Sequence, residues 1–271
     1  VGGATFEGNQ SYYNGGAIYN CADYDSIGGI ITIGDNAVFS SNTASRDGGA
    51  IYNTGSSAKI YISNAEFTDN SATAGTSSRA KGGAIYNSGT VNLIANDGKT
   101  ITFTGVAPAD LPTGVTAYKV DSIYNTATLN INGTSLADAT NGTVKLQMIE
   151  DAATPTGTTN IYGGTVLAQG TVKQRAVNLY NGKLDLRALL TGNVNISDGQ
   201  FVSNADGDIN GTATITGGTN EFGGDVTTAV ISNGTNTFNS TNTTTTATIS
   251  GGTSTFNGSV GTATISGGET E

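Results

Sequence analysis

The chain has 271 residues, 40 of them Gly, and a formal net charge of −10 with no His. The few Lys and Arg residues are scattered, so the composition argues against nucleic-acid binding. The lack of His removes the commonest general base and metal ligand. Hydrophobic residues make up 36% of the chain and recur at regular intervals among Gly, Asn and Thr. This pattern indicates many short strands joined by turns, and we expect an all-β chain.

Residues 1–104 contain two short motifs that alternate. The hexapeptide GGAIYN occurs at Gly15–Asn20, Gly48–Asn53 and Gly82–Asn87, at spacings of 33 and 34 residues. Each copy follows a Phe-x-x-Asn element, and a further β-rich run lies between the motifs. One repeat therefore supplies three short strands, which form one coil of a three-sided, right-handed parallel β-helix. The Phe-x-x-Asn elements begin at Phe6, Phe39 and Phe67.

Alternation along a strand predicts which side chains of GGAIYN face the core. We expect the Ile inside, the following Tyr outside, and the final Asn in a hydrogen-bonded ladder at the turn. We interpret the outer Tyr stripe as a stacked ladder that stabilises the wall; the alternative is a platform for sugar rings. The columns are Ile18, Ile51 and Ile85; Tyr19, Tyr52 and Tyr86, extended by Tyr124 and Tyr180; and Asn20, Asn53 and Asn87.

Residues 105–190 keep strand-like runs but lose the strict period, and all three Pro fall there. Pro is typical of loops that leave a β-helix wall. Binding residues concentrate on loops held by a rigid scaffold, so we predict a contact surface on segments 74–81, 106–119 and 147–158; the alternative is that they cover a bent part of the solenoid. Its candidate residues are Asp110, Tyr118, Glu150 and Asp151, together with Tyr19, Tyr52 and Tyr86.

Residues 191–271 have a shorter period. Ile recurs there at spacings of 16, 18 and 16 residues, and Phe keeps step with it at 16 and 18. Shorter repeats predict tighter turns and a slimmer coil, so we expect one continuous solenoid from residue 1 to residue 271. The periodic residues are Ile215, Ile231, Ile249 and Ile265, with Phe222, Phe238 and Phe256.

The paired GGAIYN and Phe-x-x-Asn motifs resemble those of the polymorphic outer-membrane protein family, whose members are autotransporter passengers. The resemblance covers about residues 1–90, with three copies of each motif in the expected alternation. It implies export across the outer membrane, cell-surface display and non-catalytic adhesion to a host or bacterial surface protein or glycan. We expect a piece of a longer protein, because the chain starts at Val1 and stops within a repeat, with membrane contact only through a C-terminal translocator outside it.

Two other chemistries have weaker support in the sequence. Asp206, Asp208 and Asn210 match the first half of a calcium loop, but the bidentate Glu at its end is replaced by Gly217. We therefore interpret this segment as a turn and expect no cofactor, with calcium as the alternative. A β-helical polysaccharide lyase or glycoside hydrolase would need clustered carboxylates, and the pair Glu150 and Asp151 has no suitable companion. A purely structural spacer is the remaining alternative.

Overall fold

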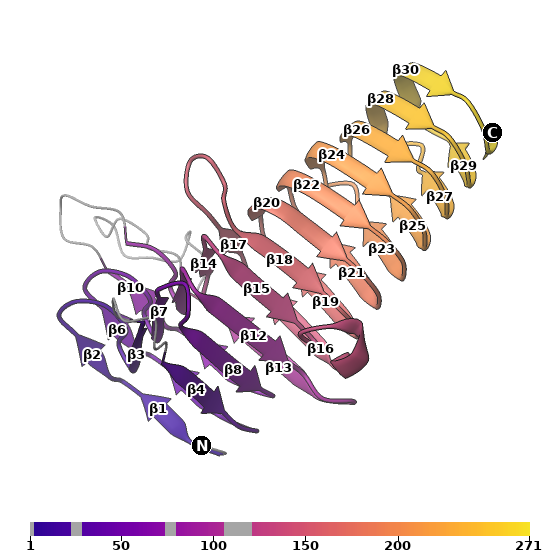
Figure 1. Ribbon diagram of the computed structural model, residues 1–271. Coiled ribbons are helices and arrows are strands. Elements are labelled where there is room, and N and C mark those ends of the chain that lie inside the picture. The colour runs from indigo at the N-terminus through magenta and orange to yellow at the C-terminus, as the bar shows by residue number, and fades with distance from the viewer. Residues whose placement is uncertain (1–2, 23–28, 74–79, 106–120) are drawn as a thin grey trace.

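The computed structural model describes residues 3–22, 29–73, 80–105 and 121–271. Within these residues, strands of successive coils pair in parallel, and the coils stack from the N-terminal to the C-terminal end of the chain (Figure 1). The single helical element there is a 3₁₀ turn, η2 (Leu136–Asp138). The predicted fold class, an all-β parallel β-helix, is confirmed.

One side of the β-helix is a sheet of twelve strands, with one strand from each coil. Its pairing is in register, so that Phe6 lies beside Phe39 and Phe39 beside Phe67. In sheet order, the strands are β1 (Thr5–Glu7), β5 (Val38–Ser40), β9 (Glu66–Thr68), β13 (Thr100–Thr104), β16 (Thr143–Leu146), β19 (Thr165–Ala168), β21 (Lys183–Leu186), β23 (Gln200–Ser203), β25 (Thr219–Phe222), β27 (Thr235–Phe238), β29 (Thr253–Phe256) and β31 (Glu269–Thr270).

The other two sides belong to one sheet of sixteen strands, which divides into two branches on the N-terminal side of β20 (Val172–Leu179). Each earlier coil contributes a separate short strand to each branch. The first branch contains β3 (Ile18–Cys21), β7 (Ile51–Thr54), β11 (Ile85–Asn87), β14 (Ile123–Asn125) and β17 (Ile149–Glu150). The second contains β4 (Ile30–Ile33), β8 (Lys59–Ser63), β12 (Thr90–Ile94), β15 (Thr128–Ile131) and β18 (Thr158–Ile161).

The two branches join at β20, because its first residue pairs with β17 and its last four residues pair with β18. From there on, one longer strand per coil covers both sides, and the coils become narrower (Figure 1). The predicted slimmer C-terminal coil is explained by this fusion of two strands into one. The fused strands that follow are β22 (Leu190–Ile196), β24 (Ile209–Ile215), β26 (Val226–Ile231), β28 (Thr243–Ile249) and β30 (Ser259–Ile265).

The wide N-terminal coils have a corner that the sequence pattern did not predict. A three-stranded sheet of β2 (Gln10–Ser11), β6 (Thr43–Ala44) and β10 (Ser71–Ala72) lies between the Phe-x-x-Asn element and GGAIYN. Each strand is two residues long, too short to show alternation in the sequence. This corner sheet accounts for the length of the 33-residue repeat.

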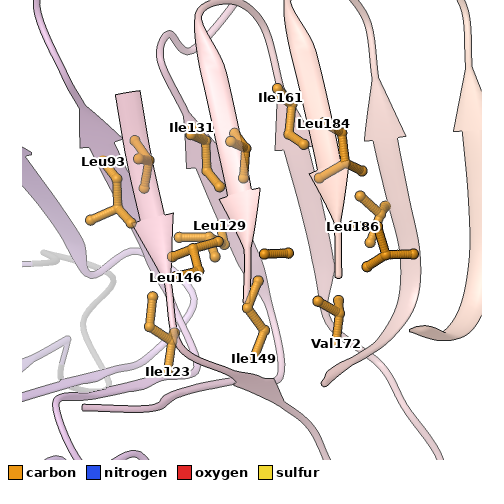
Figure 2. Close-up of a cluster of buried hydrophobic side chains, with 14 of the residues drawn as sticks. Leu93, Ile123, Leu129, Ile131, Leu146, Ile149, Ile161, Val172, Leu184 and Leu186 are labelled. Carbon is orange, nitrogen blue, oxygen red and sulfur yellow. The ribbon is translucent and has the colours of Figure 1, made fainter. Parts of the chain in front are cut away.

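The core fills the interior with columns of like side chains. Ile51, Ile85 and Ile123 are at most 1% exposed, and they lie in one register column with Ile18, as predicted. Aliphatic side chains from successive coils continue the core through the middle of the chain (Figure 2). Two Phe stacks run along the twelve-stranded sheet, namely Phe6, Phe39, Phe67 and Phe103, and Phe201, Phe222, Phe238 and Phe256.

Candidate contact surface

Four Tyr side chains form a continuous column on the outer face of the first branch. They occupy the same register position of β3, β7, β11 and β14, one place after the buried Ile. Successive ring centroids are 5.2, 4.7 and 5.5 Å apart, and the ring planes are within 9–17° of parallel. The column is Tyr19, Tyr52, Tyr86 and Tyr124.

The stacking decides what this column can offer to a partner. Tyr52 and Tyr86 have a neighbouring ring on both faces, so only their ring edges reach the surface. A sugar ring would need an open aromatic face, and these two residues have none. Tyr19 at the end of the column is 56% exposed, whereas Tyr124 is 7% exposed. Burial, helped by nearby Tyr52 and Asp47, raises the pKa of Tyr86 to about 12, so its phenol stays neutral at physiological pH.

Charged side chains lie in the turns that lead into these strands. The Asp47 carboxylate accepts a hydrogen bond from the Lys81 backbone N–H at 2.9 Å, and the Lys81 ammonium lies 4.9 Å from the centre of the Tyr124 ring. Burial raises the pKa of Asp47, and the positive charge of Lys81 opposes this effect. The Arg46 guanidinium lies 5.1 Å from the ring centre of Tyr13. Both cations thus make cation–π contacts with Tyr rings.

Two further Tyr residues project from the turn between β2 and β3. Tyr12 is 87% exposed and Tyr13 is 61% exposed, and their rings meet edge to face with centroids 6.1 Å apart. Exposed large aromatic side chains beside Arg are the composition of binding hot spots. We call the whole set the aromatic surface, defined by Tyr12, Tyr13, Tyr19, Tyr52 and Tyr86 with Arg46 and Lys81.

Register places one of the predicted loop residues in the Tyr column. Glu150 in β17 is the pairing partner of Tyr124, so it continues the column by one coil. Asp151 does not join it. Its side chain is 7% exposed, and its carboxylate accepts backbone N–H bonds from Ala152, Thr156 and Gly157 at 2.6–2.8 Å. Asp151 therefore closes its own loop.

Asp110 and Tyr118, with all of segment 106–119 and most of segment 74–81, are outside the described residues. The expectation that Tyr180 extends the Tyr column is wrong, because Tyr180 follows the end of β20 and stacks on Tyr162 with ring centroids 5.0 Å apart. The two Tyr rings form a separate pair, since β18 and β20 are neighbours in the second branch.

In the segment proposed as a calcium alternative, Asp206 and Asp208 lie in the turn between β23 and β24, and Asn210 is the second residue of β24. Asp206 and Asn210 are exposed. One carboxylate oxygen of Asp208 accepts the backbone N–H of Asp225 in the next coil at 2.7 Å, and Asp225 accepts that of Thr243 at 2.6 Å. These carboxylates tie successive coils together. Among the described residues, no three His, Cys, Asp or Glu side chains gather as a metal site would require.

The predicted Asn ladder of GGAIYN is present and longer than expected. Each Asn amide donates to the side-chain oxygen of the Asn in the next coil at 2.7–2.8 Å, from Asn20 through Asn53 and Asn87 to Asn125. Asn125 in turn donates at 2.6 Å to the side-chain oxygen of Gln174 in β20, two coils further on. A second ladder lies on the outer face of the second branch, with bonds of 2.7–2.9 Å. Sequence analysis missed it, although an Asn followed by Leu or Ile recurs in each strand. Its rungs are Asn92, Asn130, Asn160, Asn178 and Asn195.

These features define a class: a repeat protein built as a parallel β-helix with outward aromatic and amide columns. Three segments, residues 3–21, 36–54 and 64–88, match the Chlamydia polymorphic membrane protein repeat. The resemblance noted from the motifs is thus confirmed, and it supports a surface protein of the autotransporter type. Comparisons with curated proteins and with solved structures gave no match. In the described part of the chain, no helix is long and apolar enough to cross a membrane.

Proposed function

We propose that this chain is a non-catalytic adhesive stalk of an exported bacterial surface protein, and that it attaches to a protein or glycan on a host or bacterial cell. The observation that carries the proposal is the aromatic surface. It contains exposed Tyr12, Tyr13 and Tyr19, with the Arg46 guanidinium over the Tyr13 ring, on a wall held by continuous ladders. A rigid scaffold that presents Tyr and Arg loses little conformational entropy on binding.

The main competing function is the cleavage of acidic polysaccharides by a β-helical enzyme. A glycosidase of this kind needs two carboxyl groups that face one substrate, about 5–9.5 Å apart. Of the pair weighed from the sequence, Glu150 continues the outer Tyr column, whereas the Asp151 carboxylate accepts three backbone N–H bonds in its own loop. The geometry of this pair favours adhesion over hydrolysis.

The test is attachment of the purified chain to cultured epithelial cells, to extracellular-matrix proteins and to bacterial cells, measured by flow cytometry and surface plasmon resonance. Replacing Tyr12, Tyr13 and Arg46 together by Ala should weaken binding at least about tenfold, because Tyr and Arg dominate hot spots. Leu136→Ala is the matched control, since Leu136 is 58% exposed in η2 and outside the aromatic surface.

Each outcome separates the alternatives. Unchanged binding by the triple variant would reject the aromatic surface, and shortening residues 147–158 to a Gly-Ser turn would then test the loops. If the chain bound to none of the cells or proteins tested, the purely structural spacer would be favoured. Release of reducing or unsaturated ends from acidic polysaccharides would favour the enzyme.

A further inference from the structure

The Phe-x-x-Asn motifs build a third ladder, at the corner where the chain enters the corner sheet. At each step, one side-chain oxygen accepts two bonds from the Asn of the preceding coil, at 3.1 Å from its backbone N–H and 2.8 Å from its amide. These two distances repeat at all three steps. The rungs are Asn9, Asn42, Asn70 and Asp121.

Each inner Asn also donates a second bond from its amide nitrogen. Asn42 donates to the Phe6 carbonyl at 2.9 Å, and Asn70 donates to the Phe39 carbonyl at 2.8 Å. The acceptor is in both cases the Phe carbonyl of the preceding coil's motif. The ladder therefore requires a donor at the second side-chain atom of each rung.

The last rung has a carboxyl group where this donor is needed. Asp121 is 0% exposed, and its Oδ1 accepts the same two bonds from Asn70 as an Asn would. Its Oδ2 is buried and has no hydrogen-bond partner. By the register of the ladder, this atom takes the place of an amide nitrogen directed at the Phe67 carbonyl. If Asp121 were ionised, its Oδ2 and the Phe67 carbonyl oxygen would both be hydrogen-bond acceptors with no proton between them. Such an arrangement is costly in a buried site.

We propose that Asp121 is a neutral carboxylic acid in the folded chain and that its Oδ2–H donates to the Phe67 carbonyl. The corner is therefore pH-sensitive: it is stabilised at acidic pH, where Asp121 is protonated. The Asp121 hydrogen bond lies where the corner sheet ends, since Asp121 is followed by β14 with no strand equivalent to β10 between them. Loss of the proton would loosen the last wide coils and leave the narrow coils unaffected.

The direction of the pH effect follows from the buried state. Burial, with a smaller contribution from the nearby Asp69 charge, raises the pKa of Asp121 from 3.8 to about 7, although bonds from Asn70 oppose the shift. In the described part of the chain, Asp69 is the charged group that acts on it. A pKa that is higher in the folded state means stability that is complete below about pH 4 and lost as pH rises through about 7.

The test is thermal unfolding of the wild-type chain, Asp121→Asn and Asp69→Asn between pH 5 and pH 8.5, followed by circular dichroism. The melting temperature of the wild type should fall by about 5 °C across this range. Asp121→Asn restores an amide donor, so it should remove this fall and melt higher than the wild type at pH 8.5. Asp69→Asn should retain most of it, because Asp121 is unchanged.

An equal pH dependence in the wild type and Asp121→Asn would overturn the proposal, and so would a lower melting temperature of Asp121→Asn at pH 8.5. Infrared spectroscopy gives a readout that does not depend on stability. At pH 5.5 the wild type should show the C=O stretch of a protonated carboxylic acid in excess over Asp121→Asn; equal spectra would mean that Asp121 is ionised.

Discussion

The wide and the narrow coils solve the same problem with different residues. Both must turn the chain at every corner without leaving buried backbone groups unpaired. In the wide coils the strands are two to five residues long, and buried Asn side chains join the corners from coil to coil. In the narrow coils the fused strands are six to eight residues long, and the corner before each strand of the twelve-stranded sheet has a Gly with positive φ.

This difference explains why the exposed aromatic residues are at one end of the molecule. The wide coils contain the additional corner sheet, and the chain between it and the next strand forms turns such as the one that carries Tyr12 and Tyr13. A Gly corner needs no side chain, so its coil closes in 16 to 19 residues and has little chain left for loops. The wide half can vary its surface, and the narrow half extends the rod.

The largest effect that we predict is on the Phe stacks, because both halves depend on them. Phe67→Ala and Phe238→Ala each remove a fully buried ring that stacks on two neighbours. Each should lower the free energy of unfolding by about 3–5 kcal/mol, measured by guanidinium unfolding. Phe256→Ala, at a partly buried position, should cost less. A much smaller loss for Phe238 than for Phe67 would mean that the narrow coils do not share the core of the wide coils.

The second prediction separates the buried amide ladder of the corners from the outer ladder, which is half-buried at Asn178. Asn53 is 0% exposed and bonds to Asn20, Asn87 and the Thr90 carbonyl. Asn53→Ala leaves buried groups unpaired and should cost about 2–3 kcal/mol. Asn178→Ala interrupts the outer ladder, where water replaces the lost bonds, and should cost less than about 1 kcal/mol. Equal losses in guanidinium unfolding would contradict the assignment of the corners to the buried ladder.

The sequence was sufficient for the features that repeat within one strand or one coil. Alternation placed Ile51 inside and Tyr52 outside, and the repeated final Asn of GGAIYN predicted its ladder. The sequence could not reveal features set by pairing between coils. Glu150 replaces the Tyr of the motif, so only the register with Tyr124 shows that it continues the column.

The Asn ladder of Phe-x-x-Asn was hidden for a related reason. Its last rung is Asp121, eighteen residues after Phe103 instead of three, so the motif is interrupted in the sequence while its hydrogen bonds persist in space. The corner sheet was missed because two residues cannot show a period. The stacked Tyr ladder, in contrast, was predicted from the repeated Tyr of GGAIYN, and the ring contacts confirm it for Tyr19, Tyr52 and Tyr86.

The smallest effect that we predict concerns the Gly corners of the narrow half. Gly218 has φ +81°, and a Cβ there would lie 2.6 Å from the Gly199 carbonyl oxygen of the preceding coil. Gly98, in a turn of the wide half, has φ +69° but no atom within 4 Å of an added Cβ. Both substitutions to Ala force a left-handed conformation, which costs about 1 kcal/mol, but only Gly218→Ala adds a backbone collision between coils. Guanidinium unfolding should therefore show a loss of about 1 kcal/mol for Gly98→Ala and about 2 kcal/mol for Gly218→Ala. Equal losses would mean that the narrow coils separate enough to admit a methyl group, and that Gly is required at their corners for its φ alone.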